Sequence, residues 1–138
     1  MQERCALTLS NRRTDVDATL RQVETFCSQQ AVPLSAMQPV LLALEELLVN
    51  IVTHGYHDEQ CHTIAVMLEL HGSHLSVEIT DDGMAFDPRT VPAPNFAMSL
   101  DERPIGGLGV WLTLKMMDEI DYRREGLLNK LRLVKGWT

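Results

Sequence analysis

The sequence predicts a two-layer α/β sandwich, in which helices cover one face of a mixed, mainly antiparallel sheet. The expected elements follow the order strand, two helices, two strands, a long loop, a helix and two strands. Helices grouped on one side of such a sheet give two layers around one core. The 138 residues are also the size of one ordinary domain, so we expect a single domain over residues 1–138.

Apolar periodicity places the individual elements. Strands are expected where apolar and polar side chains alternate, at residues 4–9, 63–70, 74–80, 120–124 and 127–134. Helices are expected where apolar side chains recur every three or four positions, at residues 16–30, 38–54 and 108–117. Gly72 and Gly126 mark two hairpin turns. The irregular segment 89–107 is long for a small domain, and such loops are usually functional, often as lids.

The helix expected at residues 38–54 organises the rest of the chain. Nearly all its side chains are apolar, so most of its circumference must be buried. Yet Glu46, Asn50, Thr53 and His54 fall at i, i+4, i+7 and i+8, which makes one narrow polar stripe. Burying a carboxylate and an amide is costly unless they are paired or line a wet cavity. We therefore expect the stripe to face a functional site, and the helix to end at Gly55 in a left-handed conformation.

Composition excludes several classes of function. A net charge of −7 argues against general nucleic-acid binding and against attraction to an anionic membrane. No stretch approaches the roughly 20 consecutive apolar residues of a membrane span, and the N-terminal residues are too polar for a signal peptide. Cys5, Cys27 and Cys61 are odd in number and irregularly spaced, which is typical of reduced thiols. We expect a cytoplasmic protein.

Three polar segments interrupt the apolar scaffold. Glu46 and Asn50 stand one helical turn apart, followed by His54-Gly55. Asp81-Asp82-Gly83 ends a strand, and Gly106-Gly107-Leu108-Gly109 begins a helix, where main-chain N–H groups and the helix dipole favour a phosphate. The sequence contains neither the P-loop nor the Rossmann glycine pattern. The three segments in this order are more specific than any one of them.

Each segment also has a simpler interpretation. Asp-Asp-Gly is a common turn, and the polar stripe could be a helix face that meets solvent. A rival site would use His54, His57, Cys61 and His62 as zinc ligands. Their spacing matches no common zinc finger, and the neighbours Cys61 and His62 would not easily converge with the others.

The motifs E-x-x-x-N…H-G-Y, D-x-G-x-x-F-D-P and G-G-L-G followed by M-D-E resemble the GHKL ATPase superfamily, which includes gyrase, heat-shock chaperones, sensor histidine kinases and mismatch-repair ATPases. Within it, the segments DDG…FDP and GGLG…MDEI are similar to bacterial anti-sigma factor serine/threonine kinases. The resemblance runs from about Leu41 to Val134. It implies the Bergerat, or GHKL, ATP-binding fold.

The resemblance also implies roles for single residues. Asn50 matches the asparagine whose amide oxygen binds the Mg²⁺ that bridges the nucleotide phosphates. Glu46 matches the carboxylate proposed as general base. Asp81 matches the aspartate that accepts a hydrogen bond from the adenine amino group, and Gly83 lets the main chain pass close to the base.

Other positions are implied less specifically. Gly107 and Gly109 match a second glycine box that holds the phosphates and hinges the lid, and Gly106 and Leu108 belong to the same segment. Ala85 stands where many relatives have a glycine, so that turn must tolerate a Cβ. His54 is expected near terminal carbonyls or phosphates, and Arg103 near the γ-phosphate. Asp82 receives no role.

At the level of function, the resemblance implies an ATP- and Mg²⁺-dependent serine/threonine kinase of the partner-switching type. It would phosphorylate a STAS-domain anti-anti-sigma protein and sequester a sigma factor or another regulator. It would form a homodimer through residues 4–30. Two alternatives stay open: an ATP-binding interaction module without phosphotransfer, and the detached ATP-binding domain of a sensor histidine kinase. We disfavour the second because no phosphoacceptor helix pair precedes this domain.

Overall fold

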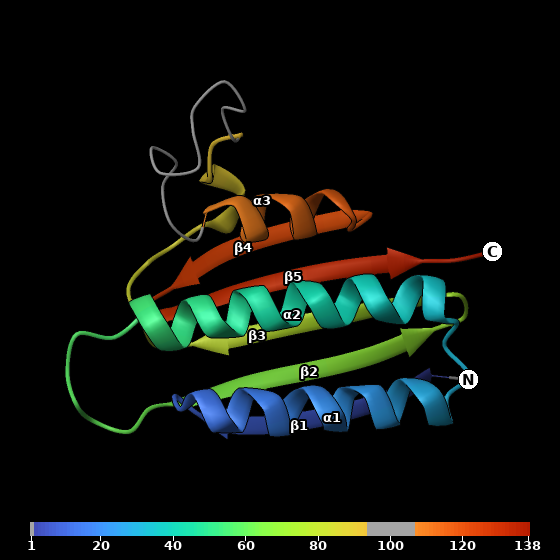
Figure 1. The fold of residues 1–138 in the computed structure, drawn as a ribbon, viewed down its shortest axis with the longest axis horizontal. Coiled ribbons are helices and arrows are strands. Elements are labelled where there is room, and N and C mark those ends of the chain that lie inside the picture. Colours follow the sequence, from blue (N-terminus) through green and yellow to red (C-terminus); the bar gives the residue numbers. More distant parts are fainter. Residues whose placement is uncertain (1, 94–106) are drawn as a thin grey trace.

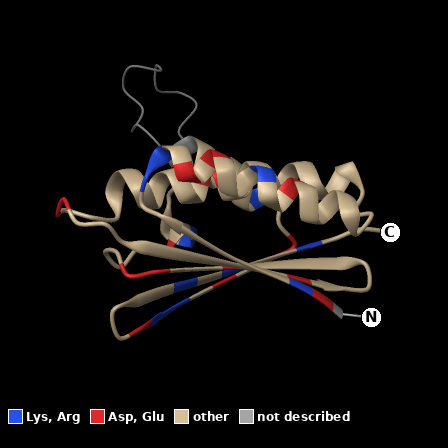
Figure 2. Cartoon of the chain, turned by 90° about the horizontal axis from the view of Figure 1, so that it is seen from below, with Lys and Arg blue, Asp and Glu red and all other residues tan. Residues whose placement is uncertain are grey.

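The computed structural model describes residues 2–93 and 107–138, which form a helical layer on one face of a sheet (Figures 1 and 2). The strands are β1 (Gln2–Ser10), β2 (Thr63–His71), β3 (His74–Asp81), β4 (Glu119–Glu125) and β5 (Leu128–Gly136). The helices are α1 (Arg13–Gln29), α2 (Leu34–His54), α3 (Gly107–Lys115) and the short 3₁₀ helix η1 (Pro88–Thr90). The predicted two-layer α/β class is confirmed.

The strand order in the sheet is β1-β2-β3-β5-β4, and each neighbouring pair among the described strands is antiparallel. The sequence analysis expected a mixed sheet, and this part of the prediction was wrong, because the described strands pair only in the antiparallel direction. The strands pair in this way because the connection through α3 carries the chain from β3 to β4 at the edge of the sheet. The next strand, β5, then lies between β3 and β4. Consequently β3 and β4 run in the same direction but never pair.

Strand alternation builds the core beneath the helices. Leu7, Val66, Ile79 and Leu131 lie side by side across four strands, because each is the cross-strand partner of the next. The last three are buried, and α2, which contains the fully buried Leu44, lies across the middle of the sheet (Figure 1). Figure 1 shows α1 over the β1–β2 side and α3 beside β4. This arrangement places the C-terminal end of α2 next to the end of β3.

The helix α2 begins four residues earlier than predicted. Pro39, which has no N–H to donate, lies inside the helix instead of near its start. The first turn forms because Ala36 and Met37 are buried in the core, so packing outweighs the proline penalty. At the other end Gly55 is right-handed, with φ of −74°, and the expected left-handed conformation was wrong.

The sequence analysis expected no stretch that approaches a membrane span, but by length and composition α2 could cross a membrane, with a mean hydropathy of 1.4 over an 18-residue window. A helix buried in the core of a folded domain can have the same composition. Seven residues of α2 are buried: Ala36, Met37, Val40, Ala43, Leu44, Leu47 and Leu48.

Candidate functional site

A cavity of ≈240 Å³ opens where the C-terminal end of α2 meets the end of β3 and the start of β5. Its walls are largely apolar, with a few polar groups from both layers. Asn50 and His54 come from α2, and Asp81 and Ala85 come from the end of β3 and the turn that follows. The full lining is Leu47, Asn50, Ile51, His54, Gly55, Ile79, Asp81, Met84, Ala85, Phe86, Pro88, Tyr122, Asn129 and Leu131. Two of the three predicted polar segments thus meet here.

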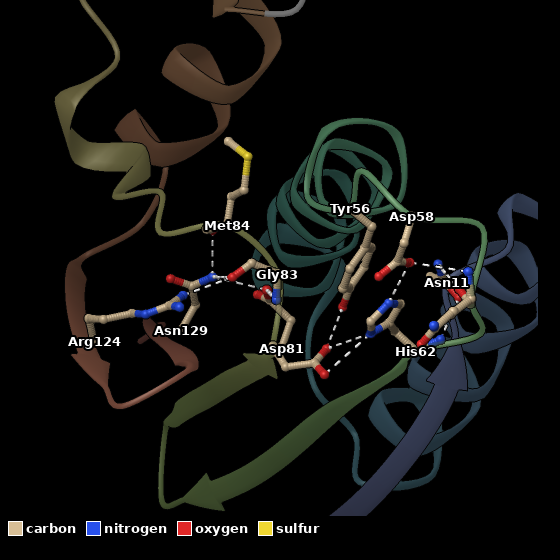
Figure 3. A network of polar contacts seen from close by, with 11 residues as sticks. Asn11, Tyr56, Asp58, His62, Asp81, Gly83, Met84, Arg124 and Asn129 are labelled. Carbon is tan, nitrogen blue, oxygen red and sulfur yellow. Dashed lines mark hydrogen bonds and ion pairs between the residues drawn. The ribbon is translucent and has the colours of Figure 1, made fainter.

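Asp81 is a buried carboxylate, 6% exposed, at the last position of β3. Its Oδ1 accepts two hydrogen bonds, from the main-chain N–H of Gly83 at 2.9 Å and from Nδ2 of Asn129 at 3.0 Å (Figure 3). Among the described residues, no hydrogen bond is made to Oδ2. A buried carboxylate oxygen without a donor is costly, so this atom is suited to accept a hydrogen bond from a ligand.

The turn after Asp81 is fixed by its main chain. The carbonyl of Met84 accepts from Asn129 Nδ2 at 2.8 Å, and that of Gly83 accepts from Arg124 at 2.8 Å. The Met84 N–H donates to the carbonyl of Gly55, also at 2.8 Å. Gly83 is required by this close approach, since a Cβ there would lie 2.8 Å from the Gly55 oxygen. The turn is therefore fastened to both layers.

The sequence analysis missed Asn129 and Tyr122. Asn129 is 5% exposed and is the direct cross-strand partner of Asp81, while the Tyr122 hydroxyl donates a hydrogen bond to its Oδ1. One signal was available. Asn129 has the same strand parity as Leu131 and Leu133, so it is a polar residue at an inward-facing position next to apolar ones.

The third segment meets the first at α3. Glu46 stands one turn before Asn50 on α2, and its carboxylate lies against Gly109 in the first turns of α3. Gly107 and Leu108 begin this helix, but the side chain of Leu108 lies outside the described part. Gly106 and Arg103 fall outside the described residues altogether. Their predicted contacts with phosphates stay predictions.

Asp82, which received no role from the sequence, joins two segments. Its carboxylate accepts from the Tyr56 hydroxyl at 3.2 Å and pairs with His62 Nδ1 at 3.3 Å (Figure 3). The other ring nitrogen of His62 lies 2.8 Å from Asp58, and the ring stacks on Tyr56 with centroids 4.1 Å apart. The hydrogen bond to Asp58, followed by that to Asp82, raises the pKa of His62. Burial, with Asp81 and Asp82 nearby, raises the pKa of Tyr56.

These contacts also bear on the alternative hypothesis of a zinc site. His62 is engaged with two carboxylates, and Nε2 of His57 contacts the sulfur of Met84. Across the residues that the structure describes, no three His, Cys, Asp or Glu side chains gather in a way that could hold a metal ion. The structure therefore does not support a zinc site built from His54, His57, Cys61 and His62.

The chemistry of the cavity suits a purine that carries an amino group. Ile79, Leu131 and Ile51 offer apolar surface to a flat ring, and the free oxygen of Asp81 is an acceptor for one N–H. The Asn50 amide lies on the same cavity wall and forms no hydrogen bond to another described residue, so its oxygen is available to a cation.

The model of the histidine kinase-like ATPase domain matches residues 9–135, which is nearly the whole chain. This chain belongs to the histidine kinase-like ATPase family. The resemblance stated from the motifs is confirmed. The family's ATP-binding character agrees with the chemistry of the cavity.

Several curated members of this family are similar in sequence. Serine/threonine-protein kinase BtrW of Bordetella bronchiseptica is 34% identical over 92 residues, 67% of this chain. Serine-protein kinase RsbW of Bacillus thuringiensis is 30% identical over 88 residues, 61% of this chain. These matches span 65% and 54% of the two relatives. RsbW of Listeria innocua is 24% identical over 132 residues, which cover 92% of this chain and 84% of that protein.

The fold comparison agrees with the family. The crystal structure of the RsbU and RsbW domains of a Mycobacterium tuberculosis protein superimposes with a TM-score of 0.66 at 13% identity. The match covers 97% of this chain and 32% of that one. At this identity the likeness shows the shared fold alone.

Proposed function

We propose that this chain is an ATP-dependent protein serine/threonine kinase that acts as an anti-sigma regulatory factor. One observation carries the proposal: segments far apart in the sequence meet around one cavity, which Asn50 from α2 and Asp81 from β3 both line. Glu46 extends the same helix face to α3, where it lies against Gly109. The relatives, which are named as serine and serine/threonine kinases, support the type of reaction.

In this proposal the adenine lies on the apolar wall, with its amino group donating to Oδ2 of Asp81. An ionised carboxylate only accepts hydrogen bonds, so it favours adenine over guanine, which presents a carbonyl at that position. The phosphates extend toward Asn50 and the N-terminal end of α3, where main-chain N–H groups favour negative charge. The proposed phosphate contacts of His54, Arg103 and the glycine segment 106–109 belong to this step.

The chemical step needs a base and a way to neutralise charge. Asn50 is the proposed protein ligand for Mg²⁺, which neutralises charge that develops on the transferred phosphoryl group. Glu46, one turn away, takes the proton from the attacking serine or threonine hydroxyl. The protein substrate is a STAS-domain anti-anti-sigma protein, and the sequestered partner is a sigma factor or a similar regulator. The chain works in the cytoplasm as a homodimer, without direct contact to nucleic acid or membrane.

A second candidate is an ATP-binding interaction module without phosphotransfer. The packing of Glu46 against Gly109 favours this module. The contact restricts the movement of the carboxylate, whereas a general base must be able to reach the hydroxyl of its substrate. Incubation with Mg-ATP and the STAS-domain proteins of the same organism, followed by mass spectrometry, separates the two. Phosphoserine or phosphothreonine on a STAS protein supports the kinase. Tight nucleotide-dependent association without phosphorylation supports the module.

A further inference from the structure

The amide of Asn129 is held in one orientation by groups on both of its ends. Its Nδ2 lies 3.0 Å from Asp81 Oδ1 and 2.8 Å from the Met84 carbonyl oxygen, both of which are acceptors. Its Oδ1 accepts a hydrogen bond from the Tyr122 hydroxyl. Turning the amide over would place its oxygen against two acceptors, so Asp81 and the Met84 carbonyl fix which end of Asn129 faces Asp81. The Tyr122 hydroxyl, by donating to Oδ1, holds the other end of the amide in place.

This orientation decides how Asp81 presents its carboxylate. A carboxylate turns easily about its last side-chain bond, and its two oxygens are chemically equivalent. Here Asn129 and the Gly83 N–H both donate to Oδ1, which fixes the plane of the group and leaves Oδ2 for a ligand. The Gly83 N–H alone would hold Oδ1 by a single hydrogen bond, which leaves the carboxylate freer to turn about its last side-chain bond than two donors do.

We propose that Asn129, held in place by Tyr122, is a positioning residue that gives the site its selectivity for a 6-amino purine over a 6-oxo purine. This inference rests on the proposed binding of ATP in the cavity. With the carboxylate fixed, Oδ2 accepts from a 6-amino group and repels a 6-oxo group. Without Asn129 the carboxylate turns, the bond to the amino group weakens, and the apolar contacts to the ring remain.

The test is the ratio of the dissociation constants of ITP and ATP, measured by calorimetry with Mg²⁺. Inosine differs from adenosine by its 6-oxo group and the proton on N1, so the ratio reports the edge of the base that faces Asp81. Asn129→Ala removes the amide. Tyr122→Phe is gentler, because it keeps the ring that lines the cavity and removes only the hydroxyl. Tyr56→Phe is the matched control, since its hydroxyl binds Asp82 and not the Asp81–Asn129 pair.

We expect wild type and Tyr56→Phe to share one preference for ATP. The preference should fall about tenfold in Asn129→Ala, the scale of one hydrogen bond to a charged group, and measurably in Tyr122→Phe. Equal losses of ATP and ITP affinity would make Asn129 a structural residue only and overturn the inference. An unchanged ratio in a folded Tyr122→Phe variant would overturn the role of Tyr122. A wild-type chain that binds no ATP would overturn the proposed function, and the inference with it.

Discussion

The Glu46 carboxylate lies against the main chain of Gly109. The two are so close that a Cβ on Gly109 would fall 2.6 Å from the carboxyl carbon of Glu46. This contact joins α2, which carries the polar stripe, to α3, which begins with the glycine segment. The atoms that a larger residue would meet are the far end of a flexible side chain. Such a residue would therefore displace the carboxylate at little cost to the fold.

Gly109→Ala should lower the rate of phosphotransfer by at least about tenfold, because small displacements of a reacting group are costly in rate. The melting temperature should change little. Single-turnover transfer under saturating ATP, alongside a melting curve, measures both. The control is the double variant Glu46→Gln/Gly109→Ala: if Gly109 acts through Glu46, it should be no slower than Glu46→Gln alone. Additive losses would assign Gly109 an independent role.

Glu46→Gln keeps the shape of the side chain and removes the proposed base. The rate of partner phosphorylation should fall by roughly 10²–10⁴, the usual contribution of general-base catalysis. Mg-ATP affinity and partner sequestration should change little, because adenine and phosphates are bound by other segments. A fully active variant would leave Glu46 with a structural role.

Asn50→Ala removes the proposed protein ligand for Mg²⁺. Nucleotide binding should lose its dependence on Mg²⁺, and phosphotransfer should be abolished, because the cation orients the γ-phosphate. Calorimetric titrations of ATP with Mg²⁺ and with EDTA measure the first effect. Transfer at the wild-type rate would show that Asn50 does not hold the metal.

Local patterns were enough to predict much of the site. The polar stripe on α2 follows from helical periodicity alone, and Asp81 follows from its place at the end of an alternating strand. Both placements survive in the structure because each depends on neighbours within one element. The start of α2 was missed because burial of Ala36 and Met37 outweighs the local signal of Pro39.

The missed residues depend on contacts between distant segments. Asn129 faces Asp81 only because β5 returns beside β3, a register that joins residues 48 apart in sequence. Strand parity shows that Asn129 points inward, but not what it meets there. Asp82 likewise finds Tyr56 and His62 only because the segment after α2 folds back over the end of β3.

The His62 contacts predict a pH-dependent stability. Asp58 and Asp82 raise the folded-state pKa of His62 above its unfolded value of about 6.5. The charged His62 therefore contributes fully to the stability of the fold below about pH 6.5. This contribution is lost as the pH rises through the folded pKa. The pKa of Asp58 is lowered, mainly by the hydrogen bond to His62, so its own contribution is lost only in acid, as the pH falls through its folded pKa.

Urea unfolding of wild type and His62→Gln between pH 5.5 and 9 measures this effect. The difference in unfolding free energy between the two should be largest at the acid end and shrink as the pH rises. Loss of the stack on Tyr56 contributes a constant offset. A difference that does not vary with pH would show that the charge of His62 contributes nothing to stability.

The most direct test of the whole account is calorimetry of Mg-ATP binding to wild type and to Asp81→Asn. Two donors face Oδ1, so the amide oxygen of the variant should take that place and turn its NH₂ group toward the adenine amino group. We predict that wild type binds Mg-ATP and that the variant loses about 1.5–3 kcal/mol of binding free energy, the range for a hydrogen bond to a charged group. Unchanged binding by a correctly folded variant would contradict the account, because the nucleotide would then lie elsewhere.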